Sequence, residues 1–260
     1  MQKFYLLAFM AISHLLYAAD PNSLTIPQAK IRPAVLLTFD DHFVDQWVAA
    51  MPVFERYNAK ATFFITGFDK LTKEQIDGIK KLNAAGHTIG CHSLRHKKAV
   101  DYVKEFSLEQ YWLDDVEPAV RLMTDSGLPP SCFAYPSSQN DTRTDGMLLK
   151  HFSHLRSGVP FSKAQSIFVP VDQIRNKGCL YGTSIDSNNK NITLEDIYSL
   201  MDKAKAENKC IVFYGHNIAA ESDKHHTSPE RLENILRYGQ KIGLEFIGFD
   251  QIKKDTQSCQ

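Results

Sequence analysis

Two adjacent carboxylates, Asp40 and Asp41, directly follow the apolar run AVLLTF at residues 34–39. A short run of this kind predicts a buried strand, with both carboxylates at its end. One aspartate there could cap a following helix by accepting backbone N–H bonds. The second is better explained by a division of labour, in which one carboxylate binds a cation and the other, kept ionised by that cation, accepts a proton.

A histidine pair, His92 and His96, follows another strand candidate, HTIGC at residues 87–91. Positions four apart share one face of a helical turn, so both imidazoles could bind one metal ion, with an aspartate oxygen from a neighbouring strand end as a third ligand. The alternative is a pair of surface histidines that form a solvated face with Lys97 and Lys98. The paired aspartates elsewhere in the chain favour the metal site.

Polar side chains follow two further apolar runs in the same way. SCFAYP leads into Ser137 and Ser138, and CIVFYG leads into His216. If the strands are parallel, all of these residues lie at one end of the sheet, which is where α/β barrels build their active sites. The sequence therefore predicts an active site at this end.

Short apolar runs alternate with longer segments of helical period along most of the chain. The strand candidates are AVLLTF, ATFFIT, HTIGC, SCFAYP, CIVFYG and EFIGF, and the helix candidates cover residues 45–57, 72–86, 107–127, 193–208 and 228–243. Several helix candidates open on Ser or Thr, as N-caps do. The alternation predicts a parallel α/β architecture, closed or partly closed into a barrel. Residues 158–190 break the rhythm and are expected to be irregular or to form short hairpins.

Composition restricts the classes of partner. With 260 residues and 43% hydrophobic residues the chain can bury one sizeable core, and we expect a single catalytic domain over residues 20–260. Thirty basic residues balance thirty acidic ones, so the overall charge indicates no nucleic-acid partner and no anionic membrane surface.

The first 19 residues, MQKFYLLAFMAISHLLYAA, have the pattern of a signal peptide, with cleavage near Ala18 or Ala19. The alternatives, a first core helix or a membrane anchor, fit less well because the apolar stretch is short for a bilayer. We therefore expect export, to the periplasm or the outside of the cell, and no membrane span after cleavage.

Five cysteines are widely spaced, and their pattern fits neither a disulfide framework nor a zinc knuckle. One disulfide bond is possible in an oxidising compartment. Most are expected to be buried as small apolar residues. They are Cys91, Cys132, Cys179, Cys210 and Cys259.

Four segments of the chain resemble, in their order, the motifs of the polysaccharide deacetylases, the NodB-homology domain of carbohydrate esterase family 4. They are TFDD, HSLRH, FAYPSS and IVFYGH. AKATFFI and AAGHTIGCHS match the connecting segments, and the resemblance covers roughly residues 33 to 250. It implies an α/β fold of the distorted (β/α) barrel type and metal-dependent hydrolysis of an acetamide or acetate ester on a sugar. It also implies a divalent metal, usually zinc, with the ligands Asp41, His92 and His96.

The resemblance implies three catalytic roles. Asp40 is similar in position to the general base and His216 to the general acid. Ser137 stands where the family offers a backbone N–H to the oxyanion. These roles suit amide hydrolysis, which needs a polarised carbonyl, an activated water and a protonated leaving nitrogen.

The third motif departs from the family pattern Arg-x-Pro-Tyr-Gly. Ala134 replaces the arginine, Ser137 the aromatic residue and Ser138 the glycine. In the family that arginine steadies the catalytic aspartate, and Arg156 in HLRSG is a candidate substitute. His42 also stands where a glycine is common.

Other polar and aromatic residues have plainer interpretations. Asp186 is a candidate support for the general acid. His225 and His226 lie in a long polar loop and are expected to be solvated there, with the lining of the active-site cleft as the alternative. Four aromatic residues of the helical segments are expected in the core rather than as sugar platforms. They are Trp47, Phe106, Tyr111 and Trp112.

The leading hypothesis is an exported, metal-dependent hydrolase that removes acetyl groups from an N-acetylated or O-acetylated polysaccharide, such as peptidoglycan or a chitin-like glycan. A second hypothesis directs the same metal site at a small non-sugar amide, since relatives of this fold open cyclic amides. A third is a carbohydrate-binding protein whose catalysis has decayed. The altered third motif favours the third hypothesis, while the intact Asp40 and His216 oppose it.

Overall fold

The computed structural model describes residues 30–253. The signal peptide expected at residues 1–19 and Cys259 lie outside the described residues.

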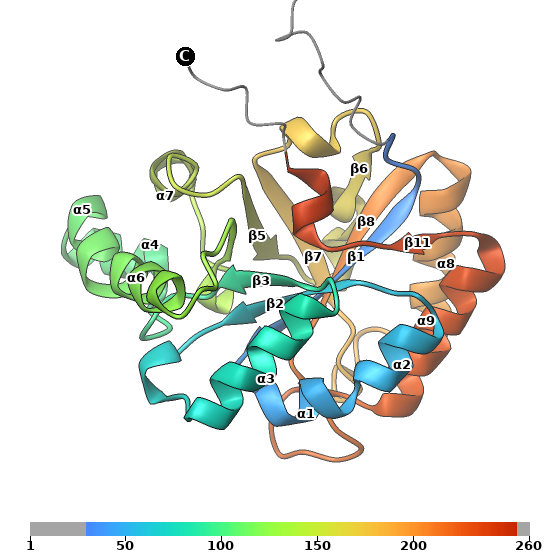
Figure 1. The fold of residues 1–260 in the computed structure, drawn as a ribbon. Helices are drawn as coiled ribbons and strands as arrows, with labels where there is room; N and C mark the ends of the chain where they lie inside the picture. Colours follow the sequence, from blue (N-terminus) through green and yellow to red (C-terminus); the bar gives the residue numbers. More distant parts are fainter. Residues whose placement is uncertain (1–29, 254–260) are drawn as a thin grey trace, which may run out of the picture. The chain divides into compact units, whose positions relative to one another are not determined.

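Within residues 30–253, seven parallel strands close into a barrel, because β8 pairs back onto β1 (Figure 1). In barrel order they are β1 (Ala34–Asp41), β2 (Ala61–Ile65), β3 (Thr88–Cys91), β4 (Cys132–Ala134), β5 (His154–Gly158), β7 (Cys179–Ser184) and β8 (Lys209–Gly215). The predicted (β/α) barrel is confirmed. Its distortion comes from short strands added at its margins, which are β6 (Phe168–Pro170) on β8, β11 (Glu245–Phe246) on β1, and the pair β9 (Asn217–Ile218) and β10 (His226–Thr227).

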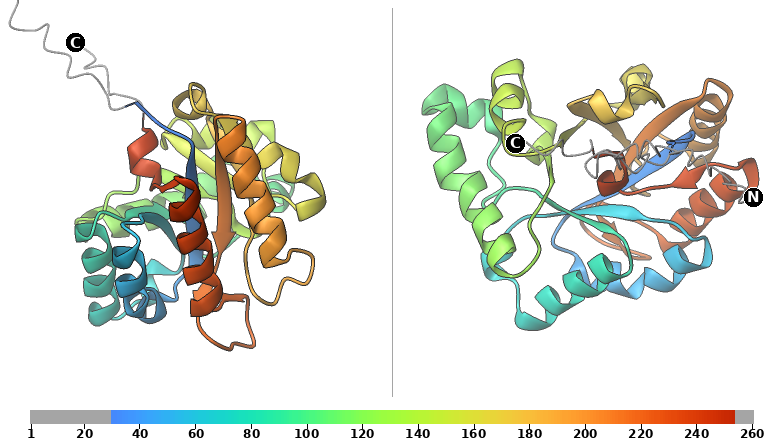
Figure 2. Two further views of the ribbon diagram at one scale, coloured as in Figure 1. Left: turned by 90° about the vertical axis from the view of Figure 1, so that its right-hand side faces the viewer. Right: turned by 45° about the horizontal axis from the view of Figure 1, so that its top comes forward.

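Helices surround the barrel, and α8 and α9 lie side by side on one flank (Figure 2). The helices are α1 (Val44–Ala49), α2 (Met51–Arg56), α3 (Lys73–Ala84), α4 (Ala99–Glu105), α5 (Leu108–Tyr111), α6 (Glu117–Asp125), α7 (Thr142–Leu148), α8 (Leu194–Ala206) and α9 (Pro229–Ile242). Each helix within residues 30–253 is too short or too polar to span a membrane.

The expected N-caps are confirmed. The side chains of Thr72, Thr193 and Ser228 each accept a hydrogen bond from the backbone N–H three residues further on, which satisfies a donor that the helix itself leaves free. At the other end of α9, Gly243 takes a left-handed conformation with φ 72°, which stops the helix.

Two expectations about the elements were wrong. The helical segment expected at residues 107–127 is confirmed over residues 108–125, but it contains a π-helical turn, η2 (Trp112–Val116), between α5 and α6. This turn comes just before Pro118, which has no N–H to continue the α-helical ladder. Residues 158–190 contain a full barrel strand, β7, whose polar and glycine positions hide its pattern. Phe106 is not in the core, since 55% of its surface is exposed.

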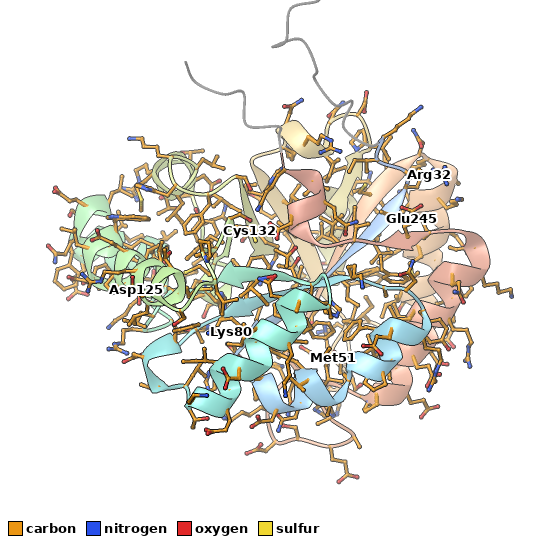
Figure 3. All side chains as sticks on the ribbon, in the orientation of Figure 1. Arg32, Met51, Lys80, Asp125, Cys132 and Glu245 are labelled. Atoms are coloured by element: carbon orange, nitrogen blue, oxygen red, sulfur yellow. The ribbon has the colours of Figure 1, made fainter. Side chains whose placement is uncertain are left out.

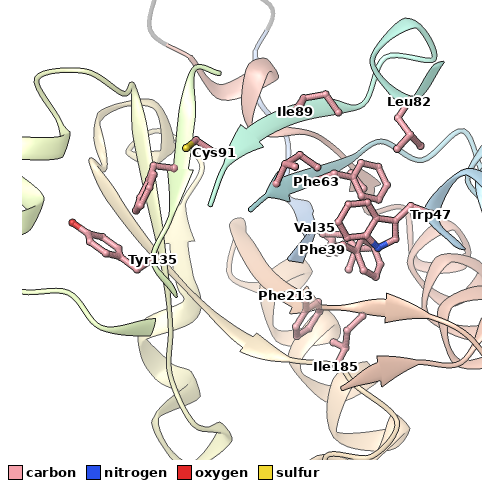
Figure 4. Close-up of a cluster of buried hydrophobic side chains, with 14 of the residues drawn as sticks. Val35, Phe39, Trp47, Phe63, Leu82, Ile89, Cys91, Tyr135, Ile185 and Phe213 are labelled. Atoms are coloured by element: carbon pink, nitrogen blue, oxygen red, sulfur yellow. The ribbon is translucent and has the colours of Figure 1, made fainter. Parts of the chain in front are cut away.

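Alternate residues of each strand face opposite sides, and this divides the core in two. Val35, Leu37 and Phe39 face the helices, where Trp47 and Phe63 pack with ring centroids 5.1 Å apart (Figure 4). A second cluster fills the barrel interior, made of residues such as Ala34, Leu36, Phe64, Cys132, Ala134 and Val212. Asp40 lies on the same inner face, two residues beyond Thr38 and four beyond Leu36.

Charged side chains surround the barrel on its outside (Figure 3). At the opening of β1, Arg32 lies 3.9 Å from Glu245 of β11, and both side chains are largely exposed. Several buried polar residues, among them Asp40, His92 and Ser184, lie instead at the carboxyl ends of the strands.

Candidate active site and metal centre

A hollow of about 690 Å³ opens over the carboxyl ends of the barrel strands. All six residues that the sequence analysis selected line it: Asp40, Asp41, His92, His96, Ser137 and His216. They come from β1, from the segments after β3 and β4, and from the end of β8. The parallel sheet thus brings together residues that are up to 176 positions apart in the chain, since 216 − 40 = 176.

Asp41, His92 and His96 form a cluster in which one ligand atom of each residue lies within 4.8 Å of the others. The Nε2 atoms of His92 and His96 lie 3.9 and 3.6 Å from Oδ1 of Asp41. One carboxylate oxygen and two imidazole nitrogens are a donor set that suits a divalent transition metal.

The environment of His92 favours the form that a metal requires. Its Nδ1 lies 2.8 Å from the carbonyl oxygen of Ala134, so Nδ1 carries the proton and the Nε2 lone pair points toward Asp41. Burial lowers the pKa of His92 and outweighs the opposing charges of Asp40 and Asp41, which keeps the imidazole neutral. The residues present therefore fit a metal ion.

The two histidines do not share a helical turn, and that expectation was wrong. Residues 92–98 form an irregular loop, in which Ser93 and His96 have φ angles of 61° and 55°. Such left-handed residues are incompatible with a right-handed helical turn. The loop nevertheless returns His96 to the side of Asp41.

Asp115 in η2, which the sequence analysis did not select, anchors this loop. Its carboxylate is fully buried and accepts hydrogen bonds from the backbone N–H groups of Arg95 and Lys97, the latter at 3.0 Å. Its carbonyl oxygen accepts a third, from Leu94, at 2.8 Å. These bonds bracket His96 on both sides and replace the hydrogen bonds that a helix would have supplied.

Asp40 points into the barrel, where it forms a buried ion pair with Arg156 of β5. The guanidinium lies over the rings of Phe64 and Tyr214, at 5.4 and 5.1 Å from their centroids. Burial by itself raises the pKa of Asp40, but the charge of Arg156, supported by His92 and His216, outweighs burial and lowers that pKa. The carboxylate is therefore ionised although it is buried.

Ala134 and Arg156 are direct partners in the register of β4 and β5. The barrel thus supplies an arginine from the strand next to the one that carries it in the family motif. The candidate substitution of Arg156 for the missing arginine agrees with this geometry.

Asp41 leaves the strand in a different direction from Asp40. Its φ angle of 85° turns the chain at the end of β1, so its carboxylate lies at the rim beside the histidines. The two neighbouring carboxylates therefore face different partners, Arg156 beside Asp40 and the histidine pair beside Asp41.

His216 is held by Asp186, which lies just beyond β7 and is fully buried. Nδ1 of His216 lies 2.7 Å from Oδ2 of Asp186, and the backbone N–H of His216 donates to Oδ1 at 3.1 Å. Thr227 and Ser184 also donate to this carboxylate. Burial by itself lowers the pKa of His216, but the hydrogen bond and charge of Asp186 outweigh it and raise that pKa.

Ser137 lies in a tight turn after β4, with φ 53° and ψ 21°. Ser138 follows with φ 56°, and its N–H donates to the carbonyl oxygen of Tyr135 at 3.0 Å. Proline cannot adopt a positive φ, so a proline at 137 would distort the turn as well as remove the N–H.

Several lining residues were not selected from the sequence. Tyr214 lies two residues before His216 on the same strand face, a spacing that could have revealed it. Asn188 and Lys190 belong to the loop after β7. His225 lies in an exposed loop, as expected, and it also lines the hollow with its ring centroid 5.1 Å from that of His216.

The four cysteines within residues 30–253 are free thiols. Cys91, Cys132 and Cys210 are buried, as expected, and Cys179 is half-buried.

Comparisons with known proteins agree with the motifs. Residues 28–151 match the family model described as polysaccharide deacetylase. A peptidoglycan-N-acetylglucosamine deacetylase of Bacillus cereus is 36% identical over 86 residues. The matched segment spans 31% of this chain and only about a third, 31%, of that relative's length.

Solved structures share the fold at low sequence identity. The catalytic domain of a peptidoglycan N-acetylglucosamine deacetylase from Eubacterium rectale has a TM-score of 0.55 at 23% identity, covering 90% of this chain and 96% of that one. The family 4 esterase domain of a xylanase from the hindgut metagenome of Trinervitermes trinervoides has a TM-score of 0.57 at 15% identity, covering 85% and 90%. A family 4 pseudoenzyme from Bacillus anthracis also has 0.57 at 15% identity, covering 86% and 66%. Residues 28–151 are thus similar to the polysaccharide deacetylase family, and the barrel as a whole shares the fold of these solved structures.

Proposed function

We propose that the protein is a metal-dependent hydrolase that removes acetyl groups from an N-acetylated or O-acetylated glycan. The observation that carries the proposal is the arrangement of one hollow, where Asp41, His92 and His96 lie beside the ionised Asp40 and opposite His216. In the reaction on an acetamide, water adds to the acetyl carbon, the C–N bond breaks, and acetate and a free amine are released.

Asp41, His92 and His96 would hold the metal, with zinc the best match to one carboxylate and two imidazoles. Such an ion would polarise the acetyl carbonyl and lower the pKa of a water molecule. The ligands come from a rigid strand end and from a loop anchored by Asp115, so their positions are set before the metal binds.

Asp40 would accept the proton of the attacking water. Its pair with Arg156 keeps it ionised and fixes its orientation inside the barrel. The absence of the arginine at Ala134 is the main argument for a catalytically decayed protein that only binds sugar. The pairing of Arg156 with Asp40 weakens that argument.

His216 would donate a proton to the leaving nitrogen. The raised pKa supports this role, because the imidazole must be protonated at working pH. Asp186 orients the ring and fixes its tautomer. The N–H of Ser137 would stabilise the oxyanion, a contact whose loss costs about 3 kcal/mol in comparable hydrolases.

The substrate class is inferred from chemistry and from relatives. The hollow is wide enough for a sugar unit, and its lining is mostly hydrogen-bonding side chains. The matched Bacillus cereus relative acts, by its name, on N-acetylglucosamine of peptidoglycan. We include export to the periplasm or beyond in the proposal, on the pattern of residues 1–19.

The test measures release of acetate from a panel of peptidoglycan, chitin oligomers and acetylated xylan, and ring opening of small cyclic amides, each with and without added Zn²⁺. Acetate from a glycan that stops on chelation and returns with Zn²⁺ supports the proposal. Turnover of the cyclic amides alone would favour the second hypothesis, and glycan binding without acetate release would favour the decayed protein.

A further inference from the structure

Trp47 in α1 donates a hydrogen bond to the candidate general acid. Its indole Nε1–H lies 2.9 Å from the backbone carbonyl oxygen of His216, a residue 169 positions away in the chain. The Trp47 side chain is fully buried, and its ring packs against those of Phe63 and Phe43, at 5.1 and 6.4 Å between centroids (Figure 4). Packing therefore fixes the direction in which the indole N–H points.

The carbonyl group of His216 lies where the barrel no longer supplies a partner. β8 ends at Gly215, and its pairing with β1 ends at the same residue, opposite Phe39. The short strand β9 begins one residue after His216, at Asn217. A backbone carbonyl between two strands needs a donor from elsewhere, and Trp47 provides it.

The other polar groups of His216 are held by Asp186. Oδ1 of Asp186 accepts the backbone N–H of His216 at 3.1 Å, and Oδ2 lies 2.7 Å from Nδ1 of the ring. A Cβ at Gly215 would lie 3.3 Å from Oδ1 of Asp186 and 2.6 Å from Oγ1 of Thr227, so the glycine allows this close approach. Within residues 30–253, Nε2 is thus the one polar atom of His216 without a hydrogen-bond partner. It is the atom that a general acid must present to the leaving nitrogen.

Trp47 also connects His216 to the segment that follows the two aspartates. α1 begins at Val44, three residues after Asp41, and packs against β9. The hydrogen bond therefore fixes the general acid relative to the strand that carries Asp40 and Asp41. Such precision matters, because a displacement of about 1 Å in a catalytic group can cost on the order of 10² in rate.

The geometry points to Trp47 as a positioning residue for His216, whose indole N–H holds the backbone of the general acid and so keeps Nε2 directed at the leaving nitrogen. This inference rests on the proposed function and adds a residue to its machinery. A side chain that only filled space would need its shape and not its N–H, so the two contributions can be separated by an isostere.

The experiment is Trp47→benzothienylalanine in the metal-loaded full chain, because sulfur in place of the indole N–H keeps the ring shape and removes the donor. We expect kcat for acetate release to fall about tenfold with KM little changed, since one hydrogen bond that orients the acid is lost. The alkaline limb should move to lower pH, because a looser His216 pairs less well with Asp186.

The matched control is Trp112→benzothienylalanine, at the other of the chain's two tryptophans. Trp112 lies in η2, where its ring stacks on that of His151 with centroids 3.7 Å apart. This variant should keep the wild-type kcat and pH profile. The same wild-type values in Trp47→benzothienylalanine would overturn the inference.

A second measurement needs no substrate. The His216 ring is titrated by NMR in the Zn²⁺-loaded wild type, in both isostere variants and in Trp47→Phe, which also lacks the donor. We expect a lower pKa for His216 in the two variants at position 47 and an unchanged pKa in the Trp112 variant. The other titratable groups that face the ring are the same in all four proteins, so a change reports the position of His216. They are Asp40, Asp41, Asp186, Tyr214 and His225.

The titration separates this inference from the proposed function. If no glycan releases acetate, the proposed function fails, and the pKa of His216 still shows whether Trp47 holds it. An identical pKa in all four proteins would exclude the positioning role of Trp47.

Discussion

Arg156 on β5 and Asp40 on β1 form a buried ion pair across the barrel, although their strands are not neighbours. Both residues lie on the inner strand faces, so the pair joins opposite walls through the interior. The family places its arginine on β4, at the position of Ala134. The pair therefore places a guanidinium beside Asp40 from the strand next to the one that carries Ala134.

Replacing Arg156 with Ala should raise the pKa of Asp40, because burial would no longer be opposed by the guanidinium. The acidic limb of the kcat/KM profile should then move to higher pH. At neutral pH, unfolding by urea should show a loss of about 3–5 kcal/mol, the usual consequence of leaving one buried charge unpaired. Since the folded pKa of Asp40 is lowered, its contribution to stability exists above the unfolded pKa and is lost as pH falls through the folded one.

Arg143→Ala is the control, because the Arg143–Asp141 pair is on the surface and should contribute about 1 kcal/mol or less. The double variant Ala134→Arg/Arg156→Ala restores the family arrangement. It should recover part of the lost activity. Wild-type activity and stability in Arg156→Ala alone would refute the role of the pair.

Substitutions of Asp40 and Asp41 should impair different properties of the enzyme. Asp41→Asn should lose metal affinity, as should His92→Ala and His96→Ala, because each removes a ligand. Asp40→Asn should keep the metal and lose turnover. Metal content by mass spectrometry, measured beside acetate release, separates the two effects, and full metal occupancy in a double histidine variant would end the ligand assignment.

Asp186→Asn should lower the pKa of His216, because the carboxylate of Asp186 accepts a hydrogen bond from Nδ1 of His216 and its negative charge stabilises the protonated ring. The alkaline limb of kcat/KM should move to lower pH, since the general acid then deprotonates earlier. His216→Ala should flatten that limb and reduce the rate by about 10² to 10⁴. Asp202→Asn, at an exposed aspartate bonded to Tyr238, should leave the profile unchanged. An unaltered limb in Asp186→Asn would mean that the limb has another origin.

Asp115→Asn should weaken metal binding by about tenfold, the effect typical of groups that orient metal ligands. The amide can accept only one of the two backbone hydrogen bonds that now bracket His96. Asp114→Asn is the matched control, since Asp114 is its neighbour but bonds to Tyr102 and Gln110 instead. Calorimetric titration with Zn²⁺ should distinguish the two variants. The melting temperature of each variant, measured without metal, shows whether Asp115→Asn acts only by lowering the stability of the fold.

His87 should make the protein less stable in mild acid. It is packed between Phe54 and Phe63 and accepts a hydrogen bond from the N–H of Ala61 at 3.0 Å. Burial, together with the charge of Lys60, lowers the pKa of His87 from 6.5 to about 4.

As the pH falls, His87 is protonated in the unfolded state before it is protonated in the folded state. The free energy of unfolding should therefore be at its full value above pH 6.5 and fall by about 3 kcal/mol as the pH decreases to about 4. His87→Asn should reduce this slope in urea unfolding at a series of pH values. His151→Asn, at an exposed histidine, should keep it. Equal slopes in all three proteins would contradict the assignment.

The sequence alone determined the features that depend on neighbouring residues. The strand ends at Asp40 and His216, the Ser and Thr caps, and the alternation of strand and helix are local patterns, because a strand repeats every two residues and a helix every 3.6. Parallel strands then require the polar strand ends to meet, so all six site residues could be placed in one hollow.

Only the tertiary structure decided which groups support them. The pairing of Arg156 with Asp40 depends on strand order and register, since one residue of slip would turn Arg156 out of the barrel. The anchoring of the metal loop by Asp115 depends on a π-helical turn twenty residues away in sequence, counted from Arg95. Asp186 meets His216 because β7 and β8 are neighbours. Such contacts are made between segments that the chain brings together only on folding, so no local pattern carries them.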